Sequence, residues 1–162
     1  MITTFLVEHP WITTVAFLAI VAVGPIAGYW LVVRRRLAMW LGLATLLPVA
    51  ALTLNPGSQD FTMGCATEWA LPTFSAVEPM ANVVLFVPPV LMLVLALRRP
   101  VAVCLGASAV SALIEVTQAL VPALDRSCST NDWLTNTLGS TLGALIAVLA
   151  IWLRSRSTAA PL

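Results

Sequence analysis

Long stretches without charged residues limit what this chain can fold into more than any other feature. Spanning the hydrocarbon core of a bilayer takes roughly 20 apolar residues in a helix, and several stretches approach or exceed that length. A soluble domain has about a quarter of its residues charged, whereas here the fraction is 9% and lysine is absent. We therefore predict an all-α, polytopic membrane helix bundle. Its five transmembrane helices are expected over residues 11–33, 37–54, 80–97, 100–121 and 133–153.

The charges predict how these spans are oriented. Cytoplasmic loops retain arginine, and one five-span arrangement puts seven of the eight arginines inside: Arg34, Arg35, Arg36, Arg98, Arg99, Arg154 and Arg156. The same arrangement puts outside every acid in a loop or at a span's end: Glu8, Asp60, Glu68, Glu78, Asp125 and Asp132. We expect a single membrane domain over residues 1–162, with the N-terminus outside and the C-terminus cytoplasmic. Its outer loops would be 55–79 and 122–132.

The fourth and fifth spans each carry one stripe of small and polar residues. The first stripe consists of Cys104, Ser108, Ser111, Glu115, Gln118 and Pro122. The second consists of Asp132, Asn136, Gly139, Gly143 and Ala147. Spacings of three and four keep each stripe on one helix face, and the short loop between the spans predicts a helical hairpin with facing stripes. Gly139 and Gly143 are expected to serve helix packing.

Two ionisable residues of this hairpin break the pattern of charges. Arg126 is the only arginine placed outside, and Glu115 is the only acid well inside a span, roughly 9 Å below the helix end. A carboxylate facing lipid is costly, so Glu115 should point into the bundle. Gly139, at a similar depth on the antiparallel helix, would leave space beside it. We predict an outward-facing polar pocket built from Asn82, Glu115, Gln118, Arg126, Asp132 and Asn136.

The same residues allow a purely structural interpretation. Glu115 would pair with Arg126, Asp132 would cap the fifth helix, and Asn136 would hold two helices together. An ionisable residue inside a membrane span points to function by default, so we favour a site.

Several kinds of chemistry lack their residue patterns here. The single histidine lies far along the chain from the acids, and no Cys/His/Asp cluster has the spacing of metal ligands. There is no glycine-rich phosphate loop and no Ser-His-Asp set. Glu115 and Asp132 are conceivable as an acid–base pair, but no nucleophile stands out beside them. We expect no metal, no cofactor and no nucleic-acid partner.

The three cysteines fall in different environments. Cys104 lies in an apolar helix, where a small buried hydrophobe is the default interpretation. Cys65 and Cys128 fall in the two outer loops, a compartment that permits disulfides. We favour a bond between them over two free thiols.

The hairpin resembles the VanZ-like family of bacterial membrane proteins. The matching residues are Glu115-x2-Gln118, then Arg126-x5-Asp132-x3-Asn136-x2-Gly139-x3-Gly143, preceded by Asn82-x3-Phe86-x-Pro88. The resemblance covers about residues 50–150. Two features depart from it, because the family often has a further acid between the Arg and the Asp, and a Gly shortly after the Phe-x-Pro. This chain has Ser127 to Asn131 and Pro89-Val90 at those places.

The resemblance implies a multi-pass protein of the bacterial cytoplasmic membrane. The founding member of the family is associated with low-level resistance to teicoplanin, a lipid-tailed glycopeptide that acts outside the membrane on wall precursors. The leading hypothesis is a non-enzymatic envelope protein that binds a polar or anionic amphiphile: a membrane lipid, a lipid-linked wall precursor or a lipoglycopeptide. In it Arg126 would hold a phosphate or carboxylate. A lipid-modifying enzyme using Glu115 or Asp132 as general base, and a structural subunit, are the alternatives.

Overall fold

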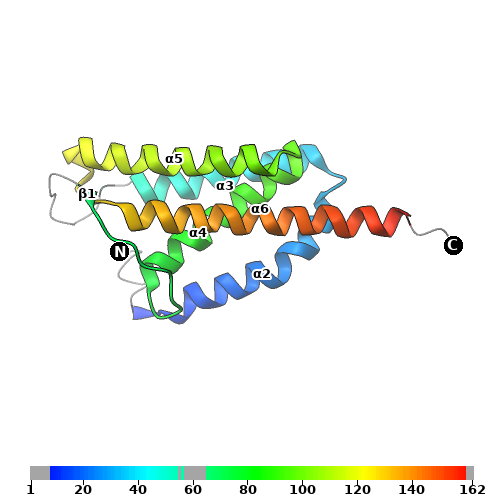
Figure 1. Cartoon of the computed structure of the whole chain (residues 1–162), viewed down its shortest axis with the longest axis horizontal. Coiled ribbons are helices and arrows are strands. Elements are labelled where there is room, and N and C mark those ends of the chain that lie inside the picture. Colours follow the sequence, from blue (N-terminus) through cyan, green and yellow to red (C-terminus); the bar gives the residue numbers. More distant parts are fainter. Residues whose placement is uncertain (1–7, 55, 57–64, 160–162) are drawn as a thin grey trace.

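Five long helices make up most of the chain. The computed structural model describes residues 8–54, 56 and 65–159. Within these residues each long helix runs antiparallel to the one before it (Figure 1), over the ranges α2 (Trp11–Leu31), α3 (Arg35–Leu54), α4 (Val77–Leu97), α5 (Pro100–Leu120) and α6 (Thr130–Ala159). All five are long and apolar enough to cross a membrane. The prediction of an all-helical bundle with five helices long and apolar enough to span a membrane is confirmed.

The helix ends differ from the predicted spans by a few residues. The largest difference is in α6, which begins at Thr130 and ends at Ala159, outside the predicted range 133–153 on both sides. Its first turn is polar and its last turns contain arginine, so hydropathy does not reveal them although the backbone is helical. A helix of this length extends beyond the hydrocarbon core at one or both ends.

Helix α4 lies at the centre of the bundle. It contacts each of the other four long helices, and Val87, Val94 and Leu95 on it are fully buried. Ala147 and Ala150 of α6 complete this core. The other three helices keep many large apolar side chains exposed, as a helix facing lipid does.

Glycines let α6 approach its neighbours closely. A Cβ on Gly143 would lie 2.6 Å from the Val87 carbonyl oxygen of α4, and one on Gly139 would collide with the backbone of Val83. Both glycines therefore serve helix packing against α4. The expectation that Gly139 leaves space beside the Glu115 carboxylate is wrong, because the carbonyl of α4 already occupies that side of Gly139.

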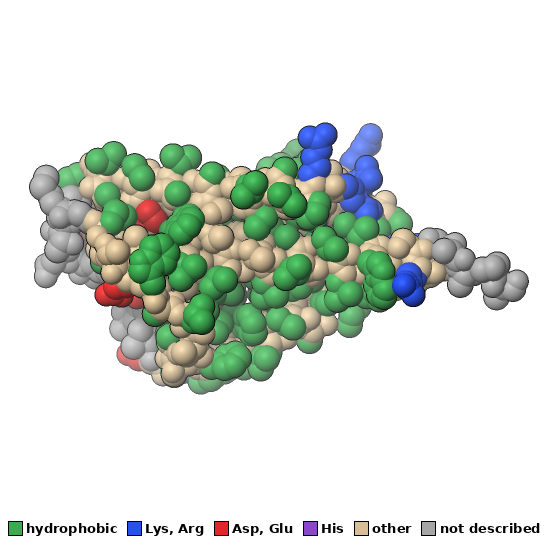
Figure 2. Space-filling view, viewed as in Figure 1, with side chains coloured by type: hydrophobic (Ala, Val, Ile, Leu, Met, Phe, Trp, Pro, Cys, Tyr) green, Lys and Arg blue, Asp and Glu red, His purple; other side chains and the backbone are tan. Residues whose placement is uncertain are grey.

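Charged side chains gather at the two ends of the bundle (Figure 2). We call the ends the arginine end, with the seven arginines named above, and the acidic end, with Glu68, Glu78, Asp125 and Asp132; Asp60 lies outside the described residues. At the arginine end, Nη2 of Arg98 donates a hydrogen bond of 2.8 Å to the Val32 carbonyl. This bond ties the α2–α3 turn to the α4–α5 turn.

Candidate functional site

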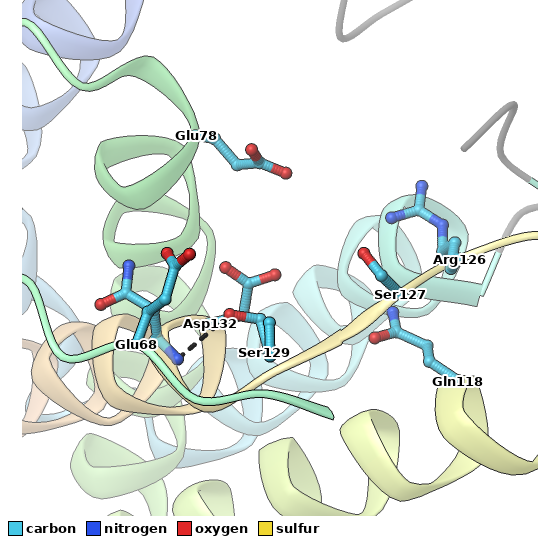
Figure 3. A pocket seen from close by; sticks show the side chains of 9 residues that line it. Glu68, Glu78, Gln118, Arg126, Ser127, Ser129 and Asp132 are labelled. Carbon is cyan, nitrogen blue, oxygen red and sulfur yellow. Dashed lines mark hydrogen bonds between the residues drawn. The ribbon is translucent and has the colours of Figure 1, made fainter. Parts of the chain in front are cut away.

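A polar cavity of about 240 Å³ lies at the acidic end, where α4, α5 and α6 meet the loops that connect α3 to α4 and α5 to α6 (Figure 3). Its lining residues are Ala66, Glu68, Glu78, Gln118, Arg126, Ser127, Ser129, Asn131 and Asp132. Some of these residues belong to loops and the others to the ends of helices. The cavity therefore depends on how the loop that contains Glu68 is attached to the hairpin.

A disulfide makes that attachment. Cys65 and Cys128 are bonded, with their Cα atoms 4.5 Å apart, and they belong to two short parallel strands, β1 (Cys65–Ala66) and β2 (Cys128–Ser129). Next to the strands, the Thr130 hydroxyl accepts a hydrogen bond of 2.9 Å from the backbone N–H of Glu68 and donates one of 2.8 Å to its carbonyl. The cross-link and these hydrogen bonds hold Glu68 over the start of α6.

One wall of the cavity is acidic. Figure 3 shows Glu68, Glu78 and Asp132 on the same side, from a loop, the first turn of α4 and the first turn of α6 respectively. The side chain of Asn82, one turn along α4 from Glu78, lies close to the Asp132 carboxylate. The charges of Glu68 and Glu78 act on Asp132 repulsively, so a cation placed among the three carboxylates would relieve their repulsion.

The opposite wall carries hydrogen-bond donors and one positive charge. Gln118, Arg126 and Ser127 face the acidic wall across the cavity (Figure 3). Gln118 is buried, and its amide nitrogen donates to the Thr53 carbonyl of α3 at 2.8 Å. Arg126 follows Asp125, whose φ of 46° ends the 3-10 turn η1 (Pro122–Leu124). Asp adopts this left-handed backbone more readily than most residues.

Glu115 and Asn136 lie buried and are not among the residues that line the cavity. The Glu115 carboxylate accepts a hydrogen bond of 2.8 Å from the backbone N–H of Ser129, so it anchors the hairpin loop from below. Asn136 donates from Nδ2 to Ser111 Oγ at 2.9 Å. Its Oδ1 is buried without a hydrogen-bond partner among the described residues.

A comparison with protein families identifies the family of this chain. The family model VanZ/LLP1 matches residues 11–152, which is most of the chain and includes every residue of the cavity. The chain belongs to the VanZ/LLP1 family. No curated protein and no solved structure matches it. The predicted family is thus confirmed, and the match extends further towards the N-terminus than the motifs around the hairpin had indicated.

Of the six residues that the sequence placed in the pocket of this VanZ/LLP1 member, three line the cavity: Gln118, Arg126 and Asp132. Asn82 stands behind Asp132, with its side chain close to that carboxylate. The predicted helix cap at Asp132 is wrong, since α6 begins two residues earlier and Asp132 lies in its first turn. A carboxylate there is still favoured by the positive end of the helix dipole.

Two cavity residues, Glu68 and Glu78, were used in the sequence only as indicators of topology. For each of the two, the sequence contains a spacing that indicates a position at the cavity. Glu78 stands four residues before Asn82, which is one turn of the same helix face. Glu68 follows Cys65 by three residues, so a disulfide to Cys128 brings it next to Asp132. Among the described residues, no group of three or more Cys, His, Asp and Glu side chains is arranged to hold a metal ion.

Proposed function

We propose that the chain is an envelope protein of the bacterial cytoplasmic membrane that binds the polar headgroup of an amphiphile in the cavity at the acidic end. The bias of arginine towards the cytoplasm puts the arginine end inside and the cavity at the outer leaflet. The family resemblance supports the bacterial setting. In this arrangement the N-terminus lies outside and the C-terminus in the cytoplasm.

The observation that carries the proposal is the distribution of charge across the cavity. Three carboxylates, Glu68, Glu78 and Asp132, stand on one wall, and Arg126 stands on the other with the hydroxyl of Ser127 (Figure 3). A guanidinium suits a phosphate or carboxylate, while clustered carboxylates suit an ammonium group. A headgroup with both charges, such as a phosphate joined to a primary amine, satisfies both walls at once.

The size of the cavity limits what it holds. At about 240 Å³ it is smaller than the 300–1,000 Å³ typical of sites that enclose drug-sized ligands. It therefore accepts a headgroup rather than a whole glycopeptide. A lipid-linked wall precursor or a lipoglycopeptide such as teicoplanin would place only one charged group in it, with its lipid tail in the surrounding membrane.

The first test is native mass spectrometry of the full-length protein with three added phospholipids. We expect the lipid retention that depends on Arg126 to favour phosphatidylethanolamine, which has a phosphate and a primary ammonium, over phosphatidylglycerol and phosphatidylcholine. Arg126→Gln should weaken this retention at least tenfold, because it removes the phosphate partner. Arg36→Gln, which removes the same charge at the arginine end, is the matched control. Arg126-dependent retention that is equal for the three lipids, or no difference between the two variants, would contradict the proposal.

A second candidate is an enzyme that modifies a lipid or wall intermediate. The observation favouring it is the proximity of two carboxylates, since the charge of Asp132 acts on the buried Glu115. Asp132, which lines the cavity, would serve as general base for a substrate held there, and the charge of Glu115 beneath the cavity would influence it. This alternative requires a new lipid mass to accumulate with time in the same incubations and to stop on Glu115→Gln. Binding without any new mass favours the binding protein.

A further inference from the structure

A second, larger hollow lies between α3 and α5 and is distinct from the polar cavity. It is an apolar groove of about 730 Å³ whose floor is α4. Leu46 and Val49 of α3 form one side, Phe86 and Leu93 of α4 the floor, and Gly106 and Val110 of α5 the other side. The only charged residue of its lining is Arg99. Because α3 and α5 face lipid, an apolar groove between them is filled by hydrocarbon rather than water.

The groove is closed towards the acidic end. There Val49, Phe86 and Ile114 pack into a small core cluster, and beyond it Gln118 of α5 hydrogen-bonds to Thr53 of α3. These contacts join α3 to α5 and separate the groove from the polar cavity. Towards the arginine end no comparable bond between α3 and α5 occurs in the described part of the chain, and Arg99 marks the mouth of the groove.

Its length matches one leaflet of a bilayer. Arg99 and Val110 are the first and last residues on the α5 side of the groove, and eleven helical residues rise about 16 Å. That is roughly half of the ~30 Å hydrocarbon core. A chain lying in the groove would therefore run from the headgroup level at the arginine end to the middle of the membrane.

Gly106 gives the groove its width. A Cβ added at Gly106 meets nothing within 4 Å, whereas one on Gly42 of α3 would lie 3.0 Å from the Leu93 side chain. The glycines of α2, α3 and α6 are explained by close packing. The glycine of α5 makes no such contact, so its lack of a side chain enlarges the open space instead.

We propose that this groove binds one acyl chain of an anionic phospholipid from the leaflet at the arginine end, with Arg99 holding the lipid phosphate. The positive charge at this end of the bundle favours an anionic lipid as the occupant. The arginines of the chain other than Arg126 gather at this end (Figure 2), and basic residues at a membrane surface attract anionic lipids. The site belongs to the opposite leaflet from the headgroup cavity and does not depend on the function proposed for it.

The test is native mass spectrometry of the full-length protein with added dioleoyl phosphatidylglycerol or dioleoyl phosphatidylcholine. We expect wild type to retain one phosphatidylglycerol that Gly106→Phe loses at least tenfold, because the ring fills the groove. Leu105→Phe adds an aromatic ring at an exposed position of the same helix outside the groove and should bind as wild type does. Arg99→Gln should keep a bound lipid but lose the preference for phosphatidylglycerol, whereas Arg36→Gln should keep both.

Several results would overturn the proposal. Equal lipid retention by Gly106→Phe and Leu105→Phe would show that the groove is not the site. A wild-type dimer that Gly106→Phe converts to monomer, without any lipid loss, would show that a second copy covers this face. If Gly106→Phe does not fold, an unchanged lipid preference in Arg99→Gln rejects the site by itself. Retention of phosphatidylethanolamine at the acidic end should be unaffected by Gly106→Phe, so the two sites are tested independently.

Discussion

The α5–α6 hairpin contains two polar regions with different partners. Towards its middle, polar groups of one helix bond to the other: Ser108 to Thr137 at 2.9 Å, Asn136 to Ser111 at 2.9 Å and Cys104 to Thr141 at 3.6 Å. Trp133 Nε1 adds a bond of 3.2 Å to the Ser108 carbonyl. We call this region the seam. It continues the stripe of α5 and uses side chains of α6, two of them threonines that the predicted stripe did not include.

At the acidic end the same stripe of α5 has other partners. Glu115 accepts from the loop residue Ser129, and Gln118 donates to Thr53 of α3. Asp132 of α6 lies beside Asn82 of α4. Because the partners come from three different elements, the two helices do not close on each other here and a cavity remains. A polar stripe on a membrane helix is therefore not in itself evidence of a site. A cavity remains where the facing helix does not supply the hydrogen-bond partners of the stripe.

The largest effect should come from a substitution that disrupts the close packing of α6 against α4, because α6 contributes residues to both polar regions. Gly139→Ala places a Cβ against the Val83 backbone, which cannot move without shifting α4. Overpacking in a tight core costs about 1–3 kcal/mol and occasionally more, and a collision with backbone belongs at the upper end. We expect the yield of folded monodisperse protein to fall sharply and its thermal unfolding temperature to drop. Gly106→Ala, where a Cβ meets nothing, is the matched control; equal loss in both variants would contradict the packing.

A smaller effect, limited to the acidic end, should follow loss of the disulfide. The Cys65→Ser, Cys128→Ser double variant frees the loop with Glu68 from the start of α6, so one carboxylate of the cavity loses its position. We expect retention of phosphatidylethanolamine to fall about tenfold, equivalent to about 1.4 kcal/mol, while the seam stays intact. Cys104→Ser keeps a hydroxyl facing Thr141 and should leave lipid retention unchanged. An unaltered cavity affinity in the double variant would show that the backbone contacts of Thr130 suffice.

These two regions also show what the sequence can and cannot predict. The five spans follow from apolar run length, and the separation of arginines from acids follows from charge alone, since both signals are local. The stripe on α5 was predictable because helical spacing defines a face. The neighbour of that face was not, because spacing does not tell which helix packs where. Gly139 therefore seemed to belong beside Glu115, whereas it contacts Val83.

The cavity itself depends on long-range contacts, and this limits prediction most. Glu68 is 64 residues from Asp132 in the chain, and only the disulfide together with the Thr130 contacts brings them to one wall. The sequence favours this disulfide because Cys65 and Cys128 fall in two loops predicted to lie on the same side of the membrane. The sequence indicated that polar residues converge at this end, but the acidic character of one wall emerged only when a loop residue, Glu68, and a helix-start residue, Glu78, were placed together.

The smallest effect should be found in the seam, and it gives the sharpest test of the contrast. Ser108→Ala and Thr137→Ala each remove one side of a single hydrogen bond. Such bonds in membrane helices contribute about 0.6 kcal/mol on average. A double-mutant cycle on the free energy of unfolding in detergent should give a coupling of about that size, with retention of phosphatidylethanolamine unchanged in all three variants. A loss of lipid retention as large as that of Arg126→Gln would mean that the seam and the cavity act as one site, and the division of the hairpin into two regions would fail.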